Sequence, residues 1–132
     1  MKQVSAIKSK TRRPYVKAKI FDNSFKLLYD TGSDITALEY NQYLRIKPLP
    51  TLKEVNKQSS FQAAGGHDLL VMGTTKLPIF IDGRETVHKF VIIKNLNEPG
   101  LIGNDFIEEK WFKYDPDIRT GVIKNHIGQQ PW

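Results

Sequence analysis

Apolar and polar residues alternate along several short segments of this chain, a pattern typical of strands that bury one face. Residues 14–21 alternate apolar side chains with Lys17 and Lys19, and the turn residues Asp22-Asn23 precede a second apolar segment at 24–29. Asparagine and aspartate favour turns because their side chains bond to the nearby backbone. The two segments therefore predict a β-hairpin.

A second hairpin is indicated by Asp82-Gly83, which lies between the apolar runs 77–81 and 86–93. Asp-Gly tolerates the positive φ angles that two-residue hairpin turns require, so this is a strong short-range signal. Nearer the C-terminus, residues 111–114 and 121–124 predict a further β pair that is joined through 115–117.

One short helix is predicted at residues 104–110, with Asn104 as its N-cap and acidic residues in its first turns. Between the two hairpins, a polar stretch at 51–60 is followed by small residues at 63–66, which predict a mobile loop. The predicted class is mostly β with one helix.

The chain has 132 residues, of which 39% are hydrophobic, and this suits one domain with a compact core. No apolar run approaches the roughly 18 residues that a membrane span requires. Cysteine is absent, which excludes disulfides, zinc-thiolate sites and a cysteine nucleophile. We expect a flexible basic arm at 1–12, a folded domain at 13–124 and a tail at 125–132.

The net charge of +6 is unevenly distributed along the chain. Seven of the 20 lysines and arginines lie in residues 1–21, which hold no carboxylate, so 13 cations face 14 carboxylates in the remainder. A basic face over the whole domain, the usual sign of a nucleic-acid module, is therefore not indicated. We interpret the arm as a solvated, mobile segment. The alternative is a weak, salt-sensitive contact with RNA or another acidic partner.

Candidate chemistry lies at Asp30-Thr31-Gly32-Ser33, directly after the apolar residues 27–29. Glycine lets the chain turn tightly and lets another backbone approach closely. Such a turn presents one carboxylate, surrounded by hydroxyl and amide donors, at the edge of a β core. Taken alone, the same tetrapeptide is also compatible with an ordinary turn at the end of a strand.

In its wider context the segment resembles the retropepsins, the dimeric aspartic proteases of retroviruses and LTR retrotransposons. The resemblance extends over roughly residues 12–124. Its features follow in the family's order: Arg13-Pro14, the active-site motif at 28–34 and its continuation at 36–39, the Gly-rich segment 63–69, the run 77–83, and the second glycine motif with its helix at 101–107. The C-terminal extension is more similar to gypsy-type retrotransposon proteases than to lentiviral enzymes.

This resemblance implies an acid-protease β-barrel with one short C-terminal helix, active as a C2 homodimer without metal or cofactor. It implies that Asp30 is catalytic and that Thr31, Gly32, Ser33 and Asp34 complete the active-site loop. It implies substrate contacts for eight residues, four of them in a flap: Arg13, Ala37, Ala63, Ala64, Gly65, Gly66, Pro99 and Leu101. The implied function is an aspartic endopeptidase that processes a Gag-Pol-like polyprotein, in the cytoplasm or within virus-like particles.

Two positions depart from the lentiviral pattern. Asn104 stands where many members carry an arginine that holds the loop aspartate, here Asp34, so Asn104 or Asp105 must organise this corner instead. Ser33 stands where many members have alanine. The resemblance implies that the Ser33 hydroxyl donates a hydrogen bond to Asp30.

Metal-free peptide hydrolysis needs a base that activates water and an acid for the carbonyl oxygen, and two carboxylates sharing one proton provide both. The chain has a single Asp-Thr-Gly, and its other aspartates are interpreted as turn residues, as a near neighbour of Asp30 or as part of the helix. The second carboxylate must then come from a second copy of the chain, which predicts a homodimer with its site on the axis. We expect residues 111–124 to supply the main intersubunit β contacts and Thr31 to reach across the axis.

Two other functions stay open at this point. One is a retropepsin-like domain within a cellular regulatory protein. The other is a non-enzymatic β-barrel module that binds single-stranded RNA, although such a module has no use for Asp30. His67, His88 and His126 are too scattered for a metal site, and we expect surface or interface roles for all three.

Overall fold

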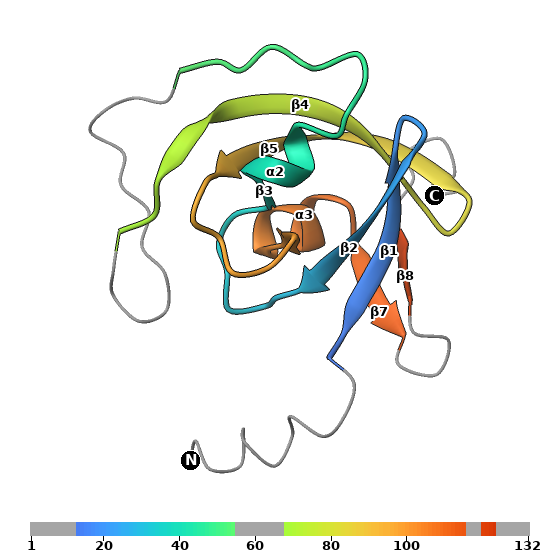
Figure 1. Ribbon diagram of the computed structural model, residues 1–132. Coiled ribbons are helices and arrows are strands. Elements are labelled where there is room, and N and C mark those ends of the chain that lie inside the picture. The colour runs from blue at the N-terminus through green and yellow to red at the C-terminus, as the bar shows by residue number, and fades with distance from the viewer. Residues whose placement is uncertain (1–12, 55–67, 116–119, 124–132) are drawn as a thin grey trace.

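The computed structural model describes residues 13–54, 68–115 and 120–123. Six strands form a closed barrel in the order β1-β2-β6-β3-β5-β4, and two more strands, β7 and β8, form a separate sheet (Figure 1). Within the described ranges the only helices are the two short ones α2 and α3. The predicted mostly-β barrel is confirmed.

The first hairpin joins β1 (Tyr15–Ile20) to β2 (Asn23–Tyr29) through Phe21 and Asp22. This turn lies one residue earlier than predicted because Asn23 already pairs with Ile20. Phe21 takes a positive φ of 55° to make the tight turn. Along β1, buried apolar residues alternate with exposed lysines, as the sequence pattern predicted.

The second hairpin joins β4 (Val71–Ile81) to β5 (Arg84–Ile93) through Asp82-Gly83. Asp82 and Gly83 have φ angles of 49° and 82°, the two positive values of a type I′ turn, so the predicted hairpin is confirmed. β1 pairs with β4 at Lys19 and Phe80, and this pairing closes the barrel.

Three short elements were not predicted from the sequence: β3 (Ala37–Glu39), α2 (Tyr40–Tyr43) and β6 (Gly100–Ile102). β6 runs parallel to β2 and antiparallel to β3, so it links two segments that lie far apart in the sequence. The predicted helix is α3 (Asn104–Glu109), which directly follows β6. Two of the six barrel strands, β3 and β6, are thus only three residues long.

The core fills the barrel and extends under α3 and the C-terminal strands. Its fully buried large side chains come from all six barrel strands and their neighbours: Ile20, Leu27, Leu38, Ile46, Leu77, Ile79, Ile81, Phe90, Ile92, Ile93, Ile102 and Phe106. Such burial of apolar area is the main favourable contribution to folding.

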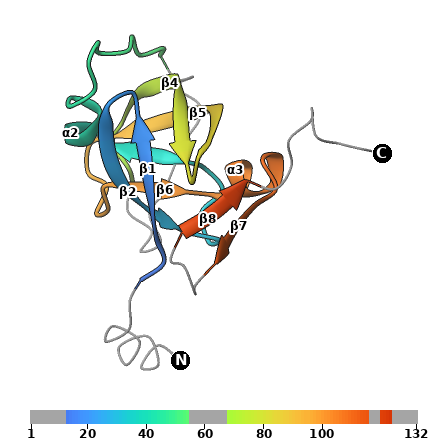
Figure 2. The same cartoon turned by 90° about the vertical axis from the view of Figure 1, so that its right-hand side faces the viewer.

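The predicted C-terminal β pair is confirmed as β7 (Phe112–Asp115) and β8 (Thr120–Ile123). β8 contacts β1 and β4, while β7 packs beside α3 (Figure 2). The Tyr114 ring of β7 stacks on Tyr29 at 5.5 Å between ring centroids. The pair is thus attached to the end of β2, one residue before Asp30. No helix in the described part of the chain is long and apolar enough to cross a membrane.

Candidate active site

Asp30 lies at the end of β2, where main-chain bonds to two neighbouring segments fix its backbone. Its amide donates to the carbonyl oxygen of Ile102 on β6 at 3.0 Å. The amide of Tyr29 donates to the carbonyl oxygen of Pro14 at 2.8 Å. Asp30 is therefore held between the start of β1 and the end of β6.

The loop after Asp30 folds back on its carboxylate. The Gly32 amide donates to Asp30 Oδ1 at 3.0 Å, and the Ser33 amide donates to the Asp30 carbonyl oxygen at 3.1 Å. A Cβ at Gly32 would lie only 3.3 Å from Asp30 Oδ1, so glycine keeps the space beside the carboxylate open. These bonds orient one partly exposed carboxylate at the surface of the chain.

Helix α3 holds this loop by its first residue. The Asn104 amide donates to the carbonyl oxygen of Ser33, and its side-chain Nδ2 donates to that of Thr31, both at 2.8 Å. The prediction that Asn104 or Asp105 organises this corner is confirmed. The prediction that Asn104 is the N-cap is wrong: Gly103 is the N-cap, because the Asn104 side chain is committed to the loop rather than to its own helix.

Gly103 crosses the active-site loop at a distance that only glycine allows. A Cβ on Gly103 would lie 2.1 Å from the carbonyl oxygen of Ile35 and 2.6 Å from its carbonyl carbon. Both are backbone atoms, so neither can rotate out of the way. The two glycine-containing motifs of the sequence thus meet backbone to backbone.

Thr36 and Asp105 form a second connection between the loop and the helix. The buried Thr36 hydroxyl donates to Asp105 Oδ1 at 2.6 Å and accepts from the Gly103 amide at 3.1 Å. The Phe106 amide also donates to Asp105 Oδ1, at 2.7 Å. This network satisfies the buried hydroxyl in both of its hydrogen-bonding roles.

His88 on β5 joins this network through the second oxygen of the Asp105 carboxylate. Its Nε2 lies 3.1 Å from Asp105 Oδ2, its Nδ1 lies 3.5 Å from Glu109 Oε1, and its ring meets Phe106 edge-on. Of the surface and interface roles expected for His88, the surface role is wrong because the side chain is buried. The sequence held a signal for this: His88 has the same β-strand phase as the buried Phe90, so both side chains point inward.

The expected hydrogen bond from Ser33 to Asp30 is also wrong. The Ser33 hydroxyl donates to the carbonyl oxygen of Ile35 at 2.8 Å and accepts from the Ile35 amide at 3.3 Å. Serine side chains commonly bond to the backbone two residues on, and this local turn captures the hydroxyl. Ser33 shapes the loop instead of contacting the carboxylate.

Three of the expected substrate-contacting residues lie close together beside the site. Ala37 pairs with Leu101 between β3 and β6, and the Pro99 carbonyl oxygen accepts from the Glu39 amide at 2.9 Å. Ala37 is 0% exposed within this chain, whereas Leu101 and Pro99 are half-buried. Their contact with substrate stays a prediction. The expected flap residues 63–66 and two histidines, His67 and His126, lie outside the described residues.

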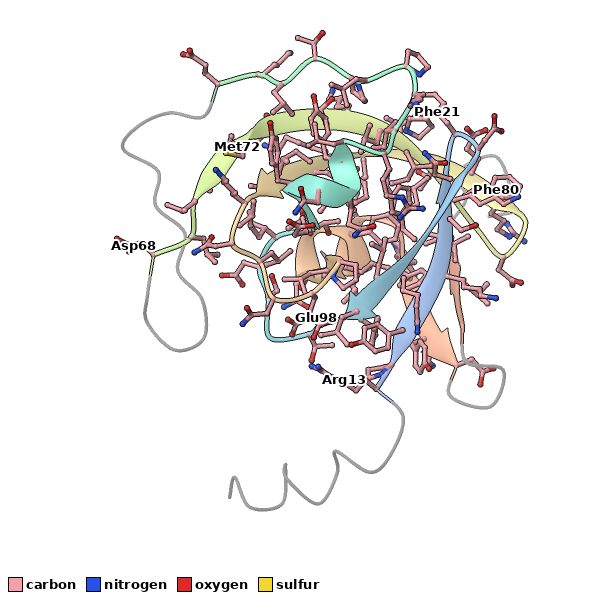
Figure 3. All side chains as sticks on the ribbon, in the orientation of Figure 1. Arg13, Phe21, Asp68, Met72, Phe80 and Glu98 are labelled. Carbon is pink, nitrogen blue, oxygen red and sulfur yellow. The ribbon has the colours of Figure 1, made fainter. Side chains whose placement is uncertain are left out.

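Arg13 points toward Glu98, from the segment just before β6 (Figure 3). Its guanidinium lies 2.7 Å from Glu98 Oε2, and the Tyr15 hydroxyl donates to Glu98 Oε1 at 2.8 Å. Burial, together with the neighbouring Glu98 carboxylate, raises the pKa of Tyr15. In this chain Arg13 therefore ties the start of β1 to the segment before β6, and its contact with substrate stays a prediction.

The described residues bring together no group of three histidine, aspartate or glutamate side chains that could hold a metal ion. What the fold does present is a single oriented aspartate on an Asp-Thr-Gly loop, braced by a second glycine motif and its helix. This oriented aspartate on a closed β-barrel is the candidate catalytic group.

Comparison with known proteins identifies the family. The family model for retroviral aspartyl proteases matches residues 10–112, and the chain belongs to this family. The resemblance noted from the sequence motifs is thereby confirmed. No curated protein matches the chain significantly.

Two solved structures share the fold. One is the retroviral protease-like domain of Ddi1 from Leishmania major, with a TM-score of 0.68, 20% identity and 88% of each chain covered. The other is the EIAV protease complexed with the inhibitor HBY-793, with a TM-score of 0.60 and 21% identity, covering 76% of this chain and 89% of that one. At these identities the similarity establishes the fold.

Proposed function

We propose that the protein is an aspartic endopeptidase whose active site forms when two copies of Asp30 meet on the axis of a homodimer. The observation that carries the proposal is the Asp30 carboxylate, held by the Gly32 amide on a loop that α3 braces at Thr31 and Ser33. A loop fixed at this many points positions one carboxylate accurately, as a catalytic group requires.

The chemistry follows from placing two such carboxylates side by side. Like charges a few ångströms apart cannot both ionise cheaply, so the pair holds one proton between them. The ionised carboxylate takes a proton from water, which attacks the peptide carbonyl carbon, and the protonated one donates to the carbonyl oxygen. The resulting tetrahedral intermediate collapses when the amide nitrogen is protonated and the C–N bond breaks.

The C-terminal sheet is the surface that we propose for dimerisation. All six barrel strands are paired within the closed barrel, whereas β7 and β8 pair only with each other among the described strands. Strands with open edges readily pair with another chain. Through Tyr29 and Tyr114, this sheet also packs beside the strand that carries Asp30, so pairing there would bring two copies of the site together.

We propose that the substrate is an extended polypeptide with bulky apolar residues flanking the cut, recognised by backbone pairing and apolar pockets. Membership in the retroviral aspartyl protease family favours a Gag-Pol-like polyprotein. We propose that it is cleaved in the cytoplasm or within virus-like particles. The second candidate is a domain of a cellular regulatory protein, which the likeness to the Ddi1 domain supports. Gag-like or reverse-transcriptase-like sequence flanking this domain in its gene would favour the first.

The proposal is tested by incubating an unstructured polypeptide with the protein at mildly acidic pH, with and without a pepstatin-like inhibitor. We expect inhibitor-sensitive cleavage by the natural sequence and none by Asp30→Asn, which keeps the side-chain shape but removes the base. Lys94→Gln, a change of an exposed residue outside the loop, serves as the matched control and should cleave normally. Equal cleavage by Asp30→Asn would overturn the assignment.

A further inference from the structure

The outer face of the sheet formed by β2, β1, β4 and β5 combines exposed lysines with exposed apolar side chains. We call this surface the basic sheet face. It comprises Lys17, Lys19, Phe21, Lys26, Lys76, Pro78, Phe80, Glu85, Val87 and Lys89. The charge balance along the sequence does not reveal this face, because Lys17 and Lys19 fall in the basic stretch 1–21 and carboxylates elsewhere balance the other lysines.

Two pairs of lysines on this face stand directly opposite each other. Lys17 pairs in register with Lys26 across β1 and β2, and Lys76 pairs with Lys89 across β4 and β5. All four side chains are exposed. Like charges in directly opposed positions destabilise a sheet, and a bound anion relieves that repulsion. The two pairs are therefore suited to negatively charged groups.

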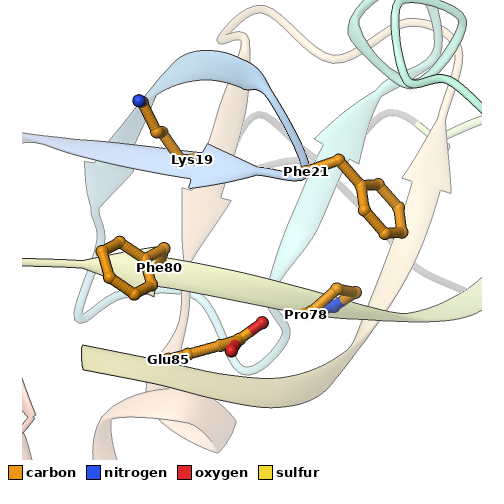
Figure 4. A pocket seen from close by; sticks show the side chains of 5 residues that line it. All are labelled: Lys19, Phe21, Pro78, Phe80 and Glu85. Carbon is orange, nitrogen blue, oxygen red and sulfur yellow. The ribbon is translucent and has the colours of Figure 1, made fainter. Parts of the chain in front are cut away.

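Between the lysine pairs lies an apolar centre with a shallow pocket. Phe21 and Phe80 are each 45% exposed, and Val87 is 53% exposed. The pocket is lined by both phenylalanines together with Lys19, Pro78 and Glu85 (Figure 4). Two partly exposed aromatic rings next to cations are the arrangement on which nucleic-acid bases stack.

The spacing places the cations on both sides of the rings. Lys76 precedes Phe80 by four residues on β4, which is about 13 Å along a strand. Lys19 on β1 pairs with Phe80. Lys17 lies two residues before Lys19, about 7 Å along β1, on the side of Phe80 opposite to Lys76. The two lysine pairs are thus separated by roughly 20 Å, with the aromatic rings between them.

We propose that the basic sheet face binds single-stranded nucleic acid, with phosphates at the two lysine pairs and bases against Phe21 and Phe80. Glu85 repels phosphate but accepts hydrogen bonds from base N–H groups, which keeps the backbone on the lysines and the bases in the pocket. An acidic polypeptide would satisfy the lysines, yet it offers no succession of flat rings for the two phenylalanines. The proposal does not depend on the proteolytic function.

The test is fluorescence anisotropy of a labelled uridylate dodecamer titrated with the full chain at several salt concentrations. Replacing two phosphate contacts by Lys76→Gln/Lys89→Gln should weaken binding about 25-fold at about 0.1 M salt and reduce the salt slope by about 1.4. Phe80→Ala should weaken binding at least about 5-fold and leave the slope unchanged. Because the lysine change removes a repulsion, the melting temperature of the double variant should not fall, which shows that its fold is intact.

Two controls separate this face from other sources of affinity. Lys47→Gln/Lys94→Gln makes the same charge change at exposed positions outside the face, and it should reduce affinity far less. Lys8→Gln/Lys10→Gln/Arg12→Gln tests the basic N-terminal arm in the full chain. Binding that is lost only in the arm variant would overturn the proposal. So would affinity that falls equally in the Lys76/Lys89 variant and in its control with two lysines changed outside the face. So would displacement of the dodecamer by polyglutamate as effectively as by unlabelled oligonucleotide, which would show that charge alone is recognised.

Discussion

Gly103→Ala is the substitution whose effect the structure determines most closely. The added methyl group would lie 2.1, 2.6 and 2.9 Å from the carbonyl oxygen, carbonyl carbon and amide nitrogen of Ile35. Ordinary contacts between heavy atoms are about 3.5–4.0 Å, so α3 and the active-site loop must separate by more than about 1 Å. Gly103 has a φ of −99°, which alanine adopts freely, so the whole cost is steric.

The magnitude follows from the bonds that this separation breaks. Overpacking by one carbon costs about 1–3 kcal/mol. The same movement stretches three hydrogen bonds, namely Gly103 amide to Thr36, Asn104 amide to Ser33 and Asn104 side chain to Thr31. Each contributes about 0.5–1.5 kcal/mol. These contributions sum to about 2.5–7.5 kcal/mol if every bond is lost. Because the bonds are stretched and keep part of their strength, we expect the free energy of unfolding to fall by about 3–5 kcal/mol, which lowers the melting temperature of a domain of this size by about 10–20 °C.

The assay is thermal unfolding followed by circular dichroism, with the cleavage rate measured well below the transition. Gly83→Ala is the matched control, because a Cβ there meets nothing within 4 Å while the φ is +82°. Its cost is conformational only, about 1–2 kcal/mol. We expect it to leave the cleavage rate unchanged, since the Asp82-Gly83 turn is far along the chain from Asp30 and joins β4 to β5.

A Gly103→Ala variant that is destabilised no more than Gly83→Ala would contradict the steric clash. A second contradictory result is a Gly103 variant that is strongly destabilised yet cleaves at the normal rate per folded molecule. That second result would show that the loop bearing Asp30 does not depend on its contact with α3.

Three further predictions concern side chains around the site. His88→Leu removes the donor to the Asp105 carboxylate and should lower both the melting temperature and the cleavage rate. His88→Gln retains a donor and should restore much of each. Equal losses in the two variants would count against a role for this hydrogen bond. The folded protein raises the pKa of Tyr15, so this residue stabilises the fold below its unfolded-state pKa near 10, and the contribution is lost as the pH rises through the higher folded-state pKa. Tyr15→Phe should therefore reduce the loss of stability that urea titrations show at alkaline pH. An unchanged pH dependence would refute this. Ser33→Ala should leave the acidic limb of the rate profile in place, because its hydroxyl bonds to the backbone and not to Asp30; a shifted limb would contradict the observed geometry.

Local signals in the sequence predicted the long elements of the fold. The Asp82-Gly83 turn and the alternation along β1 depend on residues adjacent in sequence, and both are found where expected. β3 and β6 were not predicted because strands of three residues carry too little periodicity. β6 also pairs with a distant segment, since its Leu101 lies opposite Leu28 of β2. Such long-range pairing is set by the packing of the whole barrel.

The candidate site was likewise predicted only in part. Asp30 and its loop were found because the motif is contiguous and the flanking features occur in order. The roles of Ser33, His88 and Asn104 depend on which of several nearby groups each side chain meets. Ser33 and Asn104 form bonds to the backbone that compete with the predicted ones, and only the three-dimensional arrangement decides between them.

The central claim is that two copies of Asp30 form one site, and a mixing experiment tests it most directly. A fixed amount of the natural chain is equilibrated with increasing amounts of Asp30→Asn, and the cleavage rate of one peptide is measured once subunits have exchanged. If only dimers with two Asp30 residues are active, random pairing reduces the rate to about one half at equal amounts and to about one quarter at a threefold excess of the variant. A rate that stays constant as the variant is added would show that one chain is active by itself and would contradict the account.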